Sequence, residues 1–320
     1  MMPQTDKKAG RDTLSSPSAM PSGSALTSGS ALTSVYRVNG SRIPPEPEED
    51  TVALEEPLEI RIVFGPDGDR QQVSLSVTMR TPGGPDGESD FELAAGFLWT
   101  EGVLSALDQI ERIRHVGLPS LEGGFRNIVS VELLPSVTVN MPHLERHVYT
   151  SSSCGVCGKT SLEAVRTRSC FTLPSQEEGA VWEPSIIHRL PETLREAQAV
   201  FDRTGGLHAA ALFSPAGDLL ALREDVGRHN AVDKLIGSQL RAGKLPLTDH
   251  LMLVSGRTSF ELVQKAMMAG IPVLAAVGAP SSLAVDLARD CGMTLLGFVR
   301  NERFNIYAGR ERIRAGHPQA

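Results

Sequence analysis

Hydrophobic and polar positions alternate along residues 51–134 in a pattern that predicts a small α+β unit. Every second residue is apolar over residues 58–64 and again over residues 73–79, and turn residues separate the two runs. This period of two predicts a β-hairpin. Residues 91–98 have helical spacing, with Ser89 and Asp90 as candidate caps. With two further strands expected at 110–115 and 127–134, we predict an amino-terminal α+β domain over residues 35–149.

The second half of the chain, residues 184–315, alternates between helical and strand periods in the order α-β-β-α-β-α-β-α-β. Its first helix is expected to open at Pro191 and to close at Thr204, before two glycines. Strands separated by helices of this length predict an α/β domain, a largely parallel sheet with helices on both faces. Ligands of such sheets bind beyond the carboxyl ends of the strands. The strands are expected at 207–213, 219–223, 251–254, 272–277 and 294–299, and the later helices at 230–241, 261–269 and 282–289.

Composition and charge narrow the class of protein. With 320 residues, 41% of them hydrophobic, the chain is long enough for about two domains. The formal net charge of −7 excludes a general nucleic-acid binder, although a local basic pocket is compatible with it. The longest apolar run, residues 271–277, is far shorter than the roughly 20 residues that cross a bilayer. Because the start of the sequence also lacks a secretory signal, we expect a cytoplasmic protein with no membrane or nucleic-acid partner.

Residues 1–34 are rich in Ser, Gly, Ala, Pro and Thr, and the unit at residues 22–27 is repeated at residues 28–33. So few large apolar side chains cannot offset the entropy lost on ordering. We therefore predict a disordered tail that ends at residue 34.

Cys154 and Cys157 form a CxxC pair within residues 150–183, which we predict to be a flexible loop because they are rich in Ser, Gly and Pro. Two thiols at this spacing meet within one turn, and Lys159 favours the thiolate, which is the reactive form. Such a pair suits disulfide exchange, binding of a soft metal, or transfer of a persulfide sulfur to an acceptor.

The surrounding residues make three alternatives less favoured: a structural zinc site, a thioredoxin-type disulfide-exchange site, and a nucleotide-binding loop. A structural zinc site needs four ligands, usually as two closely spaced pairs; Cys170 and His188 could complete a set, but they are not a close pair, so we expect no structural metal. A thioredoxin-type site would follow the first strand of a βαβ unit, which the preceding residues do not provide. The sequence at residues 153–160 also approaches a phosphate-binding loop, but Ser153 replaces its first glycine.

Several blocks of sequence occur in a fixed order along the chain. They are EEPL at 55–58, MRTPG at 79–83, ELAAGFL at 92–98, EG at 101–102, SCGVCG at 153–158, TGGLHAA at 204–210, EDVGRHNAVDK at 224–234, SGR at 255–257 and GFVR at 297–300. Together they resemble the FdhD/NarQ family of formate dehydrogenase accessory sulfurtransferases, over about residues 35–307. No single block would be specific, but their ordered occurrence is.

This resemblance implies a sulfurtransferase that acts as a sulfur carrier. Such proteins receive sulfur from a cysteine desulfurase as a persulfide on the CxxC motif. They pass it to the molybdenum or tungsten bis(guanine dinucleotide) cofactor that a formate dehydrogenase accepts. By the motif, Cys154 takes the persulfide position and Cys157 is its partner. A homodimer is also implied, and a chaperone that binds the cofactor without sulfur chemistry is the alternative.

The resemblance further implies that the carboxyl domain is a cytidine-deaminase-like three-layer domain, which the predicted element order suits. Zinc deaminases carry H-x-E and P-C-x-x-C at the helix starts after their second and third strands. Here the first position holds His229-Asn230-Ala231 and the second holds residues 255–259, SGRTS, so the glutamate and the cysteines are missing. We therefore exclude deamination and expect the scaffold to bind a nucleotide-like cofactor.

Pyrophosphates and guanines require cationic side chains and helix amino termini. Arg257 lies in a small, polar strand-to-helix turn, and Arg228 and His229 directly precede the predicted helix at 230–241, so these three are candidate cofactor ligands. Arg223 is expected to join them, with Asp225 and Asp233 as ion-pair or capping partners of the basic residues. His208 and Cys291 are expected in the core. The resemblance adds the family's cofactor-binding segment, position by position: Phe298, Val299, Arg300, Asn301, Glu302 and Arg303.

Overall fold

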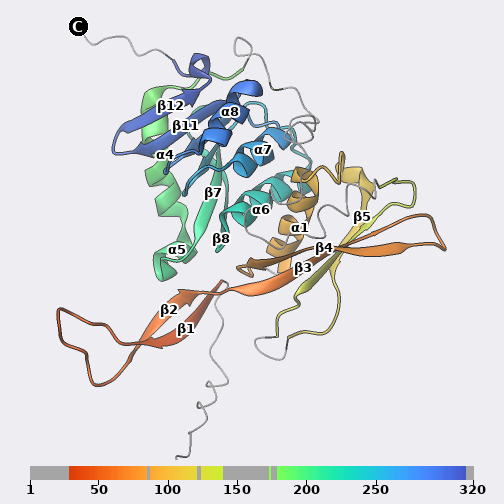
Figure 1. The fold of residues 1–320 in the computed structure, drawn as a ribbon, viewed down its shortest axis with the longest axis horizontal. Coiled ribbons are helices and arrows are strands. Elements are labelled where there is room, and N and C mark those ends of the chain that lie inside the picture. The colour runs from red at the N-terminus through yellow and green to blue at the C-terminus, as the bar shows by residue number, and fades with distance from the viewer. Residues whose placement is uncertain (1–28, 85–86, 121–123, 140–172, 174–178, 315–320) are drawn as a thin grey trace, which may run out of the picture.

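The computed structural model describes residues 29–84, 87–120, 124–139, 173 and 179–314. The predicted loop with Cys154 and Cys157, and most of the predicted tail, lie outside these residues. Three sheets and the helices around them make a mixed α/β structure (Figure 1). No helix in the described ranges is long and apolar enough to span a membrane.

The amino-terminal unit is a four-stranded sheet covered by helix α1, as the alternation predicted. Its strands have the order β4-β3-β6-β5, and β3 and β4 form the expected antiparallel hairpin. The helix begins at Glu88, three residues earlier than expected: Gly87 is the N-cap, so Ser89 and Asp90 lie in the first turn and are not caps. The elements are β3 (Glu56–Phe64), β4 (Gln71–Arg80), α1 (Glu88–Thr100), the short 3-10 helix η2 (Leu107–Gln109), β5 (Ile110–His115) and β6 (Ile128–Leu133).

A separate two-stranded hairpin precedes this sheet and projects from the body (Figure 1). Its strands are β1 (Ser30–Val35) and β2 (Glu48–Ala53), which pair antiparallel in register from Ser30↔Ala53 to Val35↔Glu48. The prediction of disorder up to residue 34 is therefore wrong for residues 30–34. A short run of Ser, Ala, Leu and Thr is ordered here because a second strand supplies its backbone hydrogen bonds.

The carboxyl-terminal unit is a six-stranded sheet with the order β12-β11-β10-β9-β7-β8. Strands β9, β10 and β11 are parallel to one another, whereas β7 runs antiparallel to both β8 and β9. The strands are β7 (His208–Phe213), β8 (Leu219–Asp225), β9 (Leu251–Val254), β10 (Val273–Ala276), β11 (Thr294–Arg300) and β12 (Arg303–Ala308). The sequence pattern predicted all of them except β12, which returns along β11 as an edge strand.

Helices cover both faces of this sheet, which gives three layers. Alternate residues of the strands, such as Ala210 and Ala211, belong to two different cores. One core packs against α6 (Arg228–Arg241), α7 (Phe260–Met268) and α8 (Ser282–Asp290), and the other packs against α4 (Pro184–Ala197) (Figure 1).

The predicted helix opened by Pro191 is instead two helices, α4 and the short α5 (Ala199–Thr204). Pro184 takes the first helical position, where a backbone N–H would have no acceptor within the helix, so its absence in proline costs nothing. Pro191 lies inside the helix. Burial of Ile187, Leu190 and Leu194 against the sheet stabilises the helix despite the second proline.

The two units share one core, because α1 crosses α6 in close contact. Buried residues of the four-stranded sheet, α1, α6 and one face of the six-stranded sheet form a single apolar cluster. Gly96 of α1 and Gly237 of α6 face each other at the crossing: a Cβ added at Gly96 would lie 1.9 Å from the Asp233 carbonyl oxygen. Each glycine is therefore required by the close approach of the other helix.

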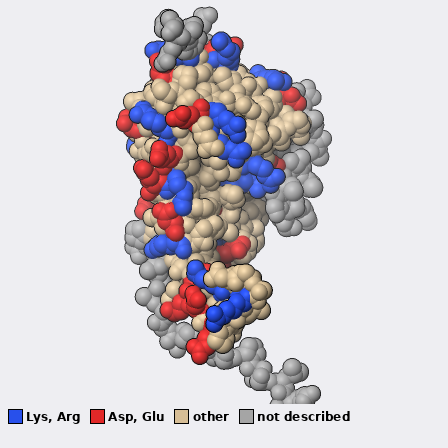
Figure 2. Space-filling view, turned by 90° about the vertical axis from the view of Figure 1, so that its left-hand side faces the viewer, with Lys and Arg blue, Asp and Glu red and all other residues tan. Residues whose placement is uncertain are grey.

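Charges are mixed on the surface. In the face shown in Figure 2, Lys and Arg side chains are interspersed with Asp and Glu. No broad basic area covers the described part of this face.

Candidate cofactor site at the carboxyl edge of the sheet

The carboxyl ends of four strands meet at one edge of the six-stranded sheet. Because β7 is antiparallel to both of its neighbours, β8 runs in the same direction as β9, β10 and β11. The edge therefore carries the ends of these four strands, the start of β7 at His208, and the amino termini of α6, α7 and α8. This is the position at which α/β sheets bind ligands, as predicted.

Backbone hydrogen bonds join the loops along this edge. The Gly278 N–H donates to the Gly256 carbonyl at 3.0 Å, and the Thr258 N–H donates to the Ala279 carbonyl at 3.1 Å. The Phe298 N–H donates to the Gly278 carbonyl at 3.0 Å, which ties β11 to the same cluster. A Cβ on Gly278 would lie 2.9 Å from the Gly256 oxygen, so the loops after β9 and β10 approach too closely for any other residue.

Two of the predicted cationic ligands lie at this edge of the sheet. Arg228 is the first residue of α6, and Arg257 is exposed between β9 and α7. Within the described part of the chain, neither guanidinium makes an ion pair within 4.0 Å. Two uncompensated cations at one edge favour an anionic ligand.

The positive charges of Arg228 and Arg257 affect the pKa of the nearby His208. It is half-buried at the start of β7, and its Nδ1 lies beside Gly256, 3.3 Å from where a Cβ would stand. Burial lowers the pKa of His208, and the charges of Arg228 and Arg257 lower it further against the opposing effect of Asp225. His208 was predicted as a core residue, but the structure places its ring at the candidate site.

His229 follows Arg228 and points toward α7. Its Nε2 lies 3.3 Å from the Ser259 hydroxyl and 3.9 Å from Oε2 of Glu261. Burial lowers its pKa to about 4, with further contributions from Lys265 and Arg228. His229 is therefore neutral at physiological pH and offers the site a hydrogen bond and not a charge.

Several hydrogen-bonding groups beside these residues have no side-chain partner in the described part of the chain. Within the described ranges, no side chain caps the amino terminus of α6 (N-cap Gly227) or of α7 (N-cap Ser259), whereas the Ser281 hydroxyl accepts the Ala284 N–H of α8 at 3.3 Å. Thr258, only 1% exposed, has a buried hydroxyl with no partner among the described residues. Two uncapped helix amino termini next to Arg228 and Arg257 make an arrangement that binds phosphate-like anions.

The segment from Phe298 to Arg303 comprises the end of β11, the turn at Asn301 and Glu302, and the first residue of β12. Three of its residues, Phe298, Asn301 and Glu302, have the positive φ values 55°, 51° and 54°. Positive φ costs about 1–3 kcal/mol at a residue other than glycine and persists where the surroundings impose it. Such strain is common at ligand sites, and it appears here in the predicted cofactor segment.

Side chains within this segment do not all face the same way. Val299 is fully buried in the core beneath α4, so only its backbone is available to a ligand. Phe298 is half-buried, and the Arg300 guanidinium lies 5.7 Å from its ring centroid. The remaining four residues are exposed: Arg300, Asn301, Glu302 and Arg303.

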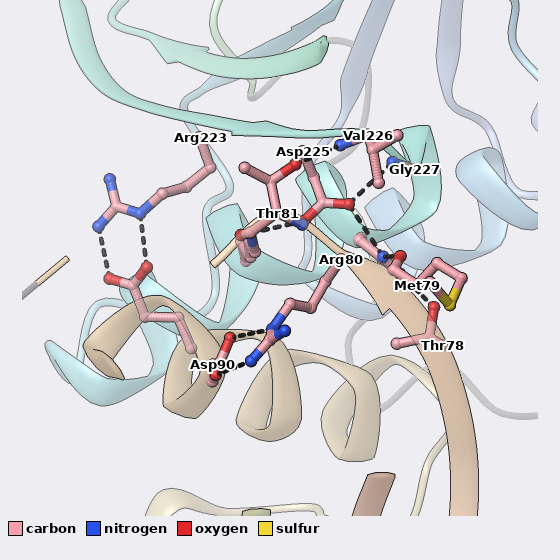
Figure 3. Close-up of polar contacts among 12 residues, drawn as sticks. Thr78, Met79, Arg80, Thr81, Asp90, Arg223, Asp225, Val226 and Gly227 are labelled. Atoms are coloured by element: carbon pink, nitrogen blue, oxygen red, sulfur yellow. Dashed lines mark hydrogen bonds and ion pairs between the residues drawn. The ribbon is translucent and has the colours of Figure 1, made fainter. Parts of the chain in front are cut away.

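Arg223 does not belong to this edge. Its guanidinium makes two hydrogen bonds to Glu92 of α1, at 2.6 and 2.5 Å, and so joins the two units (Figure 3). Asp225 and Asp233 are ion-pair partners as predicted, but of Lys234 and Lys265 and not of the arginines. Cys291, expected to be buried, is only partly buried against the main core.

A pocket of about 240 Å³ lies at the junction between the two units. It is lined by residues such as Thr81, Arg223 and Lys234, and Arg223 is the one predicted cofactor ligand among its lining residues. Local sequence patterns do not connect residues 78–81 with residues 225–234, which lie about 150 positions apart. Residues 79–81 and 225–234 each fall within one of the ordered sequence blocks, which is the signal in the sequence that singles them out.

Comparison with known proteins decides the family. The sequence pattern of the FdhD/NarQ family matches residues 55–314, which is most of the chain. The chain belongs to the FdhD/NarQ family.

Relatives of this FdhD/NarQ protein are similar over nearly their whole length. It is 52% identical to the sulfur carrier protein FdhD of Streptomyces avermitilis over 280 residues, which cover 87% of this chain and 94% of the relative. It is 51% identical to the protein of the same name from Streptomyces coelicolor, with the same coverage. The crystal structure of a protein assigned as a formate dehydrogenase accessory protein from Desulfotalea psychrophila has the same fold, with a TM-score of 0.65 at 23% identity over 89% of this chain and all of that one.

Proposed function

We propose that this FdhD/NarQ protein is a sulfur carrier that supports the activity of a formate dehydrogenase. The observation that carries the proposal is the family match over residues 55–314, together with relatives about half identical that are named sulfur carrier protein FdhD. We propose Cys154 and Cys157, which lie outside the described residues, as the reactive pair.

The two cysteines suit a two-step transfer. The Cys154 thiolate attacks the outer sulfur of a persulfide on a cysteine desulfurase, and the desulfurase leaves as a thiolate, so no net oxidation occurs. Release then reverses the roles: the Cys157 thiolate attacks Sγ of Cys154, which forms a disulfide and expels the terminal sulfur as hydrosulfide. A cellular dithiol must reduce that disulfide before the next cycle. In this sense the protein is a sulfurtransferase.

We propose that the acceptor is the molybdenum or tungsten bis(guanine dinucleotide) cofactor, bound at the carboxyl edge of the six-stranded sheet. Arg228 and Arg257 supply positive charge there, and the uncapped amino termini of α6 and α7 supply N–H donors. His229 offers a neutral hydrogen-bonding group, because its pKa is only about 4. These features suit the phosphates of a dinucleotide. The β11–β12 turn, with Phe298 and Arg300, would contact its guanine or pterin.

The carboxyl unit also suits a deaminase-like scaffold that has lost its chemistry. We propose this relationship from the three layers and from the helix starts at Arg228 and Phe260, where zinc deaminases hold their metal. His229-Asn230-Ala231 and Ser255–Ser259 occupy those positions without glutamate or cysteine. The partners that follow from the proposal are a cysteine desulfurase, a formate dehydrogenase and a second copy of this chain, in the cytoplasm.

Intact-mass measurement tests the sulfur-carrier role. The purified protein is incubated with a cysteine desulfurase and cysteine, and its mass is recorded before and after reductant. We expect a reducible gain of about 32 Da, one sulfur atom, which Cys154→Ala abolishes. Cys291→Ala, a cysteine of the carboxyl unit far from the motif in sequence, is the matched control and should keep the gain.

Two results would redirect the proposal. If Cys154→Ala gains the same reducible mass as the wild type, Cys154 is not the carrier. If Cys154→Ala acquires no sulfur and yet supports full formate dehydrogenase activity in cells, the protein is a cofactor chaperone. In both cases, guanine-nucleotide binding reports separately on the carboxyl edge.

A further inference from the structure

Thr81, the residue after β4 in the amino-terminal unit, forms hydrogen bonds to the loop that precedes α6 and to α6 itself (Figure 3). The Thr81 N–H donates to Oδ2 of Asp225 at 3.1 Å, and its hydroxyl accepts the Val226 N–H at 3.2 Å. Lys234 Nζ donates to the Thr81 carbonyl at 2.8 Å. All three polar groups of a residue that is 5% exposed are therefore bonded to the carboxyl unit.

Asp225 gathers the same loop around one fully buried carboxylate. Its Oδ1 accepts the Gly227 N–H at 2.8 Å and the Asn230 side-chain amide at 3.0 Å. Its Oδ2 faces Lys234 Nζ at 2.5 Å in addition to the Thr81 N–H. A buried carboxylate that accepts this many donors holds the turn from β8 into α6 in one conformation.

Asn230, in the first turn of α6, ties the helix itself to β4. Its amide nitrogen donates to the Met79 carbonyl at 2.7 Å, and its amide oxygen accepts the Thr78 hydroxyl at 3.2 Å. Residues 78–81 of one unit thus contact residues 225–234 of the other through side chains and backbone alike (Figure 3).

We propose that Thr81, Asp225 and Asn230 are positioning residues for the cofactor site. They fix the start of α6, and with it Arg228 and His229, in the orientation that receives a guanine nucleotide. This inference rests on the proposed function of the carboxyl edge. The N–H groups of Val226 and Gly227 are used by Thr81 and Asp225, while α6 has no side-chain cap and keeps its first N–H donors for a ligand. Holding these donors in place before binding removes an ordering cost from the binding step.

Three variants separate positioning from general stability. Thr81→Val keeps the volume and backbone of Thr81 but removes the acceptor of the Val226 N–H. Thr81→Ser retains that acceptor. Glu92→Gln weakens the Arg223–Glu92 ion pair, which joins the same two units without touching the loop. The affinity for guanosine diphosphate is measured by calorimetry, and amide hydrogen exchange is followed at residues 226–230.

We expect Thr81→Val to raise the Kd for guanosine diphosphate about tenfold, which corresponds to about 1.4 kcal/mol. It should also accelerate exchange at residues 226–230. Thr81→Ser should stay within about twofold of the wild-type Kd, because the hydroxyl is restored. Glu92→Gln should lower the melting temperature and leave both the Kd and the exchange of the loop unchanged.

The inference is overturned if Thr81→Val exchanges and binds like the wild type. It is also overturned if Glu92→Gln loses as much affinity as Thr81→Val, since the effect would then be one of interface stability. Failure of the proposed function looks different. In that case the wild type does not bind guanosine diphosphate at all, and the exchange rates alone decide whether Thr81 holds the loop.

Discussion

At the crossing of α1 and α6, we predict that replacing a glycine by alanine destabilises the protein, although helix propensity alone would favour alanine. Glycine inside a helix is less favourable than alanine by about 1 kcal/mol, so Gly96→Ala or Gly237→Ala would stabilise a helix that stood alone. In the folded protein, a Cβ at Gly96 would lie 1.9 Å from the Asp233 oxygen, and a Cβ at Gly237 would lie 1.9 Å from the Glu92 oxygen. Both of these oxygens belong to the helix backbone, so they cannot move aside by rotation of a side chain.

The size of the effect follows from the distance the helices must move. Real Cβ contacts are essentially never shorter than 3.0 Å, so the axes must separate by more than about 1 Å at a tightly packed interface. Overpacking of this kind costs about 1–3 kcal/mol or more, and the propensity gain offsets only part of it. We expect a net loss of about 2 kcal/mol for each variant, or roughly 5 °C in melting temperature.

Urea unfolding followed by far-ultraviolet circular dichroism measures this loss through a lower midpoint at an unchanged slope. The double variant should lose less than the sum of the single losses, because the first substitution already separates the helices. Gly206→Ala, in a loop, is the matched control: its added Cβ would lie 3.3 Å from the Ala53 side chain and at the ordinary contact distance of 3.8 Å from the Thr204 oxygen. A midpoint for Gly96→Ala equal to or above that of the wild type would refute the reasoning.

Three further predictions concern charged groups. Because the pKa of His229 is about 4 in the folded protein and about 6.5 in an unfolded chain, only the unfolded state gains this proton between those values. The unfolding free energy should therefore fall by about 2–3 kcal/mol as pH drops from 6.5 to 4, and His229→Gln should flatten this part of a urea titration run across pH; an unchanged slope would contradict the assignment. Lys265→Met should cost about 3–5 kcal/mol of stability because it leaves Asp233 buried and unpaired, and Lys265→Met with Asp233→Asn should recover most of it in the same assay. Arg257→Gln should weaken guanosine diphosphate binding about tenfold and flatten its dependence on salt, while the exposed control Arg203→Gln does neither; equal salt dependence in the two variants would place the phosphates elsewhere.

Local patterns located most of the secondary structure and the edge where a ligand would bind. Periodicity placed the β3–β4 hairpin, α1, and the alternation of strands and helices from β7 to β11, because each buries one regular face. The same alternation brought Arg228 and Arg257 to one edge, since parallel strands end together. The ordered sequence blocks led to the family that the comparisons then established.

Elements that depend on a distant partner escaped this reasoning. Strand β1 has no apolar alternation of its own and is held by pairing with β2, and β12 depends on the left-handed turn at Asn301 and Glu302. The inward direction of Val299 reflects the irregular register after Gly297, which no count of residues reveals. Helix α4 contains Pro191 because the apolar face that it buries outweighs the hydrogen bond lost there.

The sequence by itself predicted the periodic elements, the candidate cysteine pair and the family, because each of these is carried by short stretches of neighbouring residues. Tertiary structure alone decided which arginines are paired, since Arg223 of β8 is neutralised by Glu92 of α1, while no carboxylate among the described residues pairs with Arg228 or Arg257. It alone brought Thr81 to Asp225, which are 144 residues apart. Such pairings follow from how α1 packs on α6. That packing requires Gly96 and Gly237, because any side chain there would collide with the backbone of the other helix, and this is visible only in the folded structure.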